Sequence, residues 1–136
     1  MFNLFGNNIT SFMKAHTRAV IATIDAANQP STSVIFYIVD DNDELFFITK
    51  SHTKKYQNIK INNCSAITVV AKDKPIAVNA TGIVEEITDE ATKDTIMQKV
   101  FKLSYSELQD YAPIIKLHKG SFSVLKFIPK EAIMTD

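Results

Sequence analysis

The sequence predicts a mainly β fold, in which six antiparallel strands form a small β-barrel with flanking α-helices. Six runs rich in β-branched and aromatic residues are separated by short turns. Only one segment, residues 89–102, carries an apolar stripe long enough for a helix of several turns. The strands are long and evenly spaced, which favours a barrel over a sandwich because closure removes exposed edges. The 136 residues correspond to a single domain, residues 1–136.

The first half of the chain predicts a short helix followed by an antiparallel meander. Ile9, Phe12 and Met13 recur at helical spacing within residues 8–16, and Asn8 is a suitable N-cap. Three strands follow, each rich in β-branched or aromatic residues, at residues 19–24, 32–39 and 44–49. The turns between them are short and polar, as in strands joined by hairpins.

The second half predicts three further strands, at residues 65–70, 76–87 and 121–128. Residues 132–134 extend the last of these strands beyond Pro129. Gly82 lies in the middle of the fifth run and predicts a bulge or bend, as at the corner of a barrel.

Three further helices are expected after the third strand. The first begins near Thr53 and places Tyr56 and Ile59 on one face. The second covers residues 89–102. A third, short helix is expected over Ser104–Tyr111, because a Ser-x-x-Glu capping box stands at its start.

Composition excludes several function classes. Fifteen basic residues balance fifteen acidic ones, whereas a non-specific nucleic-acid binder carries a basic surplus, so no nucleic-acid partner is expected. No apolar run approaches the roughly 18 residues that read as a membrane-spanning helix. The first residues lack the basic start, apolar core and cleavage site of a signal peptide. We therefore expect a cytoplasmic protein without a membrane partner.

The side chains that bind metals or form disulfides are sparse. Cys64 is the only cysteine, which excludes an internal disulfide and a CxxC redox pair. We expect it to be buried and inert. His16, His52 and His118 lie far apart, without the close spacing typical of metal ligands, so no metal site is expected.

The helix that begins near Thr53 has the wrong charges for its dipole. Lys54 and Lys55 occupy its first turn, and Lys50 and His52 come just before it. A cation at a helix N-terminus costs about 0.3–1 kcal/mol. A bound anion would remove this conflict, because backbone N–H groups, a hydroxyl and ammonium groups together bind phosphate. The alternative is a solvated basic helix start in a lysine-rich chain.

The segment from Arg18 to Glu86 orders its motifs as ATID, SVIFY, an acidic turn, LFFITK, TKKYQNI and NCSAITVV. In that order and spacing it resembles the pyridoxamine 5′-phosphate oxidase-like family of FMN-binding split barrels, and SFSVLKFIPKEAI is similar to the last strands of that family. The resemblance implies a six-stranded antiparallel split barrel that forms a homodimer, with FMN in clefts between the subunits. The family's C-terminal substrate motif, with its Arg and His, is absent from FIPKEAIMTD. Vitamin B6 synthesis is therefore not expected.

The resemblance also implies which residues hold the cofactor. One strand would line the flavin, the next would lie near the ribityl chain and phosphate, and the helix start would clamp the phosphate: Ser33, Val34, Ile35 and Phe36; Ile48, Thr49 and Lys50; Thr53, Lys54 and Lys55. Because the flavin ring itself carries the redox chemistry, no catalytic side chain can be named.

The implied activity is that of an FMN-dependent oxidoreductase acting on an unidentified small molecule. Four alternatives stay open: a non-catalytic flavin carrier or sensor, a haem-binding relative, a protein that binds the deazaflavin F420, and a barrel without cofactor that serves as an interaction module.

Overall fold

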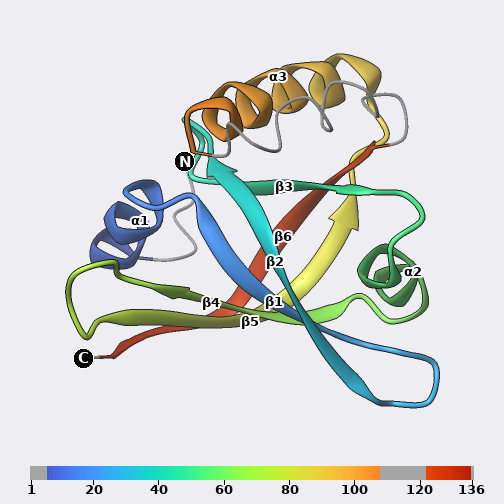
Figure 1. Cartoon of the computed structure of the whole chain (residues 1–136), viewed down its shortest axis with the longest axis horizontal. Coiled ribbons are helices and arrows are strands. Elements are labelled where there is room, and N and C mark those ends of the chain that lie inside the picture. The colour runs from blue at the N-terminus through green and yellow to red at the C-terminus, as the bar shows by residue number, and fades with distance from the viewer. Residues whose placement is uncertain (1–5, 108–121, 136) are drawn as a thin grey trace.

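The computed structural model describes residues 6–107 and 122–135, which form a β-barrel flanked by helices (Figure 1). The elements in chain order are α1 (Asn7–Lys14), β1 (Arg18–Ile24), β2 (Pro30–Val39), β3 (Leu45–Lys50), α2 (Lys54–Ile61), β4 (Cys64–Val70), β5 (Ala77–Glu86), α3 (Glu90–Glu107) and β6 (Phe122–Thr135). The strands close in the order β1-β2-β3-β6-β5-β4, and every neighbouring pair is antiparallel. The predicted mainly β, six-stranded barrel is therefore confirmed.

The barrel is split where β2 leaves β3. Only three residues of each strand pair, Tyr37–Val39 of β2 with Leu45–Phe47 of β3. Residues 30–36 of β2 pair with β1 instead. Helix α2 follows β3 directly and contacts β1 and β2 beyond the short ladder. In Figure 1, α2 lies at the end of the barrel where β3 and the β1–β2 hairpin diverge. The split therefore places the start of α2 beside the last residues of β3.

The predicted irregularity at Gly82 is confirmed. The register of β5 and β6 shifts between Thr81 and Gly82, opposite Pro129. A Cβ at Gly82 would lie 2.9 Å from the carbonyl carbon of Ile128 and from the Cα of Pro129. Only glycine lets the two backbones approach this closely.

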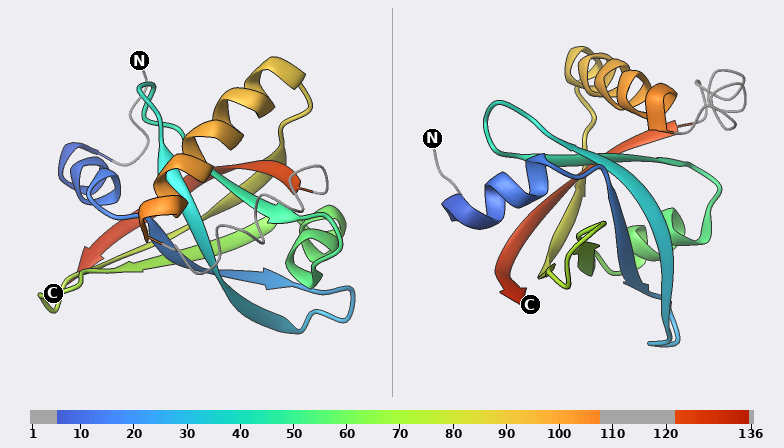
Figure 2. Two further views of the ribbon diagram at one scale, coloured as in Figure 1. Left: turned by 45° about the horizontal axis from the view of Figure 1, so that its top comes forward. Right: turned by 60° about the vertical axis from the view of Figure 1, so that its left-hand side comes forward.

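Two apolar clusters hold the helices on the barrel. Inside the barrel, Met13 of α1 is fully buried, and the buried Tyr37 hydroxyl donates a hydrogen bond to the Met13 carbonyl oxygen over 2.8 Å. Outside the barrel, Val100 of α3 packs with Phe46 of β3 and Val124 of β6. Figure 2 shows α3 lying across this side of the barrel, away from β4 and β5.

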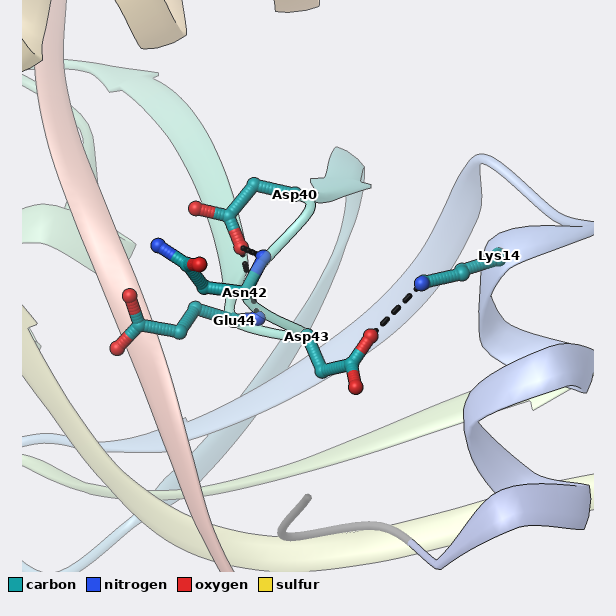
Figure 3. A network of polar contacts seen from close by, with 5 residues as sticks. All are labelled: Lys14, Asp40, Asn42, Asp43 and Glu44. Atoms are coloured by element: carbon teal, nitrogen blue, oxygen red, sulfur yellow. Dashed lines mark hydrogen bonds and ion pairs between the residues drawn. The ribbon is translucent and has the colours of Figure 1, made fainter. Parts of the chain in front are cut away.

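The β2–β3 turn joins α1 to the barrel through polar contacts (Figure 3). The Asp40 carboxylate accepts hydrogen bonds from the backbone N–H groups of Asn42 and Glu44, at 3.0 and 2.9 Å. The neighbouring Asp43 forms an ion pair of 2.7 Å with Lys14, the last residue of α1. The acidic turn therefore has a structural role at this end of the barrel.

Three sequence predictions were wrong in detail. Helix α3 runs on to Glu107, so Ser104 lies inside it and does not begin a new helix; no glycine or proline interrupts the chain there. The remainder of the predicted third helix lies outside the described residues. The N-cap of α1 is Gly6, because its carbonyl accepts the first helical hydrogen bond, so Asn8 is helical. Cys64 is exposed at the start of β4.

None of the helices in the described ranges is both long and apolar enough to cross a membrane.

Candidate functional site

The candidate site is the N-terminus of α2 together with the end of β3. Thr53 is the N-cap: its hydroxyl accepts a hydrogen bond from the Tyr56 N–H at 3.3 Å and donates one to the Lys50 carbonyl at 2.9 Å. The Thr49 hydroxyl lies 2.9 Å from the Thr53 hydroxyl, and the Lys55 ammonium donates to it over 3.3 Å. These hydrogen bonds form one series that runs from the Lys55 ammonium through the Thr49 and Thr53 hydroxyls to the Lys50 carbonyl. The series fixes these groups in place, and we call them the α2 corner.

Lys55 carries a positive charge that the described residues do not neutralise. Its side chain is partly buried, and this burial lowers the pKa of its ammonium. In the described ranges, no carboxylate lies within 4 Å of it, whereas Lys14, Lys93 and Lys126 all have such partners. Placing an unpaired cation in a half-buried position costs free energy. An anion at this position would offset that cost.

The backbone adds two further donors at the same place. The first N–H groups of a helix have no partner within the helix. The N–H groups of Lys54 and Lys55 donate no hydrogen bond within the described part of the chain. Together with the Lys55 ammonium and the partial positive charge of the helix N-terminus, they form an arrangement that suits a phosphate group.

A buried polar contact sets the position of α2. The Asn58 amide donates to the Thr23 hydroxyl at 3.1 Å and to the Ser31 hydroxyl at 3.3 Å. Asn58 and Thr23 are 4% and 1% exposed. Sequence reasoning missed this contact, although the polar Thr23 and Ser31 occupy inward positions of β1 and β2. Asn58 therefore ties the helix that carries the candidate site to the β1–β2 hairpin.

The structure brings most of the predicted phosphate residues together, and α2, which carries several of them, also contacts β2, the strand predicted to line the flavin. Thr49, Lys50, Thr53 and Lys55 share one hydrogen-bonded corner, and Lys54 is exposed beside it. Ile48 precedes this corner and packs against the α3 cluster.

The predicted flavin strand, residues 33–36 of β2, lies on the part of β2 that does not pair with β3. Its side chains alternate, so that Ile35 points into the core at 2% exposure and Val34 points outward at 57%. Ser33 and Phe36 are half-buried. A ligand on this strand would therefore meet the backbone and the side chain of Val34, and the side chain of Ile35 would stay in the core.

The two histidines within the described ranges, His16 and His52, do not form a second site. The His16 ring nitrogen Nδ1 lies 2.7 Å from the Phe12 carbonyl oxygen, and the two rings stack at 4.3 Å. His52 is exposed, and His118 lies outside the described residues. The described ranges contain no group of three or more potential metal-ligating side chains.

A comparison with known protein families shows to which family this chain belongs. The family model described as pyridoxamine 5′-phosphate oxidase matches residues 5–136. The chain belongs to the pyridoxamine 5′-phosphate oxidase-like family. Members of this family typically bind a flavin and are generally dimeric. A search of curated proteins finds no match.

Solved structures share the fold of this family member at low sequence identity. ChuZ from Campylobacter jejuni has a TM-score of 0.79 and 14% identity, over 95% of this chain and 54% of that one. HutZ, named as the haem storage protein from Vibrio cholerae, has a TM-score of 0.69 and 11% identity, over 98% and 94%. A protein named F420 reductase has a TM-score of 0.67 and 21% identity, over 90% and 94%. These similarities establish the split-barrel fold.

Proposed function

We propose that this protein is a homodimeric FMN-binding flavoprotein of its family and an oxidoreductase acting on a small molecule. One observation carries the proposal: the partly buried Lys55 ammonium has no carboxylate partner among the described residues and lies beside the free N–H groups of α2. Flavin binding is typical of the family, and a phosphate-bearing flavin would supply the missing negative charge.

Each part of the site has a separate task in this proposal. The Lys55 ammonium and the N–H groups of Lys54 and Lys55 bind the phosphate. The Lys54 ammonium attracts the phosphate more weakly, because it is exposed to solvent. The hydroxyls of Thr49 and Thr53 keep the Lys55 ammonium directed at the phosphate position.

Strand β2 provides the surface along which the ring would lie. There Val34 and Phe36 would contact the ring with their outward side chains, and Ser33 and Ile35 would contact it with the backbone alone. When bound, the flavin supplies the hydride or electron transfer. The chain then needs only to bind and orient it.

The test is the binding of FMN compared with riboflavin, which has the same ring system without the phosphate. The variant carries Lys54→Ala and Lys55→Ala. A matched control carries Lys72→Ala and Lys74→Ala, which removes the same charge from the exposed β4–β5 turn. A charge-assisted hydrogen bond contributes about 1.5–3 kcal/mol, so we expect FMN affinity to fall roughly 10- to 100-fold. Riboflavin affinity should not change, and the control should bind FMN as the parent does.

Two results would overturn the proposal. If the first variant and the control bind FMN equally well, the phosphate does not lie at α2. If the purified protein shows a Soret band and no flavin bands, and added FMN does not bind, the pocket belongs to a haem. Turnover is tested separately, by anaerobic reduction of the bound flavin with NADH and NADPH. A flavin that neither donor reduces would favour a carrier or sensor over an oxidoreductase.

A further inference from the structure

The turn that joins β3 to α2, residues 50–53, is held by a distant strand as well as by its own residues. Within the turn, the Thr53 N–H donates to the Lys50 carbonyl over 3.2 Å. The Ser51 and Ser123 hydroxyl oxygens lie 2.8 Å apart, in a hydrogen bond between residues 72 positions apart in the sequence. Figure 1 shows β3 running through this turn into α2. The Ser51–Ser123 bond therefore joins the approach to α2 to strand β6.

Ser123 also lies beside the α2 corner. In the register of β3 and β6 it is the partner of Thr49, whose hydroxyl accepts a hydrogen bond from the Lys55 ammonium over 3.3 Å. Directly paired residues of antiparallel strands have their side chains on the same face, about 4.5–5.5 Å apart at Cβ. Ser123 and Thr49 are 4% and 3% exposed. One buried residue of β6 thus neighbours Thr49 and holds Ser51.

Helix α2 is poorly suited to fix its own first turn. It is eight residues long, and isolated helices of that length are marginal in water. Its buried residues, Asn58 and Ile59, both follow the first turn, and the cations within that turn oppose the helix dipole. Asn58 ties the body of the helix to the β1–β2 hairpin. The bond between Ser51 and Ser123 provides a second anchor, on the side of β3 and β6.

We propose that Ser123 is a positioning residue for phosphate binding. Through Ser51 it holds the β3–α2 turn, so that the Lys55 ammonium and the first N–H groups of α2 are directed at one point. This inference rests on the proposed function, which assigns the phosphate to the α2 corner. Donors that are held in place before the ligand arrives bind it more tightly, because binding then requires less ordering of the protein.

A merely structural role for Ser123 predicts a different result. If its hydrogen bond only stabilised the barrel, losing the bond would lower the melting temperature without changing the preference for a phosphate-bearing ligand. A positioning role acts on the phosphate, because the flavin ring is proposed to lie along β2. Ser123→Ala should therefore weaken the binding of FMN and leave the binding of riboflavin unchanged.

The experiment measures the dissociation constants of FMN and riboflavin for the parent, Ser123→Ala, Ser51→Ala and the double variant. We expect Ser123→Ala to raise the FMN constant roughly 3- to 10-fold, the equivalent of one hydrogen bond, and to leave the riboflavin constant within about twofold of the parent. Ser51→Ala removes the same bond at an exposed residue and should have the same effect. The double variant should bind FMN no more weakly than either single variant, because one bond is lost in all three.

The matched control is Ser65→Ala. Ser65 is also a buried serine of a barrel strand, but its hydroxyl has no hydrogen-bond partner among the described residues. This substitution therefore removes the same atom without breaking such a bond, and the control should bind both ligands as the parent does. Hydrogen exchange in the ligand-free protein adds an independent measure of the turn. Amides of residues 50–56 should exchange faster in Ser123→Ala than in the control.

The outcomes separate this inference from the proposed function. If Lys54→Ala with Lys55→Ala weakens FMN binding but Ser123→Ala binds FMN as the control does, the positioning role is overturned and the phosphate site stands. Equal losses of FMN and riboflavin affinity in Ser123→Ala would show a structural role and also overturn the inference. If the double lysine variant binds FMN as the parent does, the proposed function fails and this inference fails with it. Should Ser123→Ala not fold, Ser51→Ala decides between the same results.

Discussion

Replacing Asn58 with alanine should loosen α2 and weaken the site that α2 carries. The Asn58 amide donates two hydrogen bonds, to Thr23 at 3.1 Å and to Ser31 at 3.3 Å, in a buried position. Each bond contributes about 0.5–1.5 kcal/mol net, and the Thr23 hydroxyl is left without its donor, so the loss should be about 2–3 kcal/mol. For a chain of this size that loss lowers the melting temperature by about 10 °C.

Urea denaturation of the parent, Asn58→Ala, Thr23→Ala and the double variant measures this effect. Because the Asn58 and Thr23 side chains are in direct contact, the free energy lost by the double variant should differ from the sum of the two single losses by about 1 kcal/mol. Gln57→Ala, an exposed neighbour on the same helix, serves as the control and should leave stability within about 0.5 kcal/mol of the parent. Additive effects of Asn58→Ala and Thr23→Ala would refute the reasoning, because the contact would then not hold the helix.

Three further predictions concern other parts of the chain. Gly82→Ala should destabilise the barrel by about 3 kcal/mol in a urea titration, since the new Cβ collides with the backbone of Ile128; an unchanged midpoint would contradict this. Because burial lowers the pKa of Lys55, the unfolded chain holds that proton more tightly, so stability should rise with pH from the lowered pKa up to the ordinary lysine value of about 10.4. In Lys55→Met this rise should disappear and stability at pH 7 should increase, as urea midpoints at pH 7 and 10 would show. Tyr37→Phe removes the hydrogen bond to Met13 and should cost about 1 kcal/mol in thermal melts; a variant as stable as the parent would show that the bond contributes nothing.

The strands could be predicted from the sequence because their signals are local. Runs such as residues 32–39 and 44–49 combine β-branched and aromatic residues with polar turns, and the structure places β2 and β3 there. The bulge at Gly82 was equally visible, since a glycine in the middle of a long strand marks a close approach of backbones. The helix that begins after Thr53 followed from its capping residue.

The contacts that join distant segments could not be predicted in this way. Asn58 meets residues that lie 27 and 35 positions away, and nothing near Asn58 in the sequence indicates its burial. The lysines at the start of α2 were predicted as a group. Only the structure distinguishes Lys55, which reaches the Thr49 hydroxyl, from Lys54, which stays exposed. The capping box at Ser104 led to the wrong prediction of a new helix, because α3 continues through Ser104. A local motif does not show whether the preceding helix has already ended.

Closure of the barrel depends on the segment that the ribosome makes last among the described residues. Strand β6 lies between β3 and β5, and it pairs with β3 over residues 122–127 and with β5 over residues 125–135. Until residues 122–135 have been synthesised, β3 and β5 each present an unpaired edge, and such edges promote pairing with other chains. A nascent chain of this protein therefore passes through a stage prone to aggregation, which ends when the final strand inserts, and a chain truncated before β6 would remain in that stage.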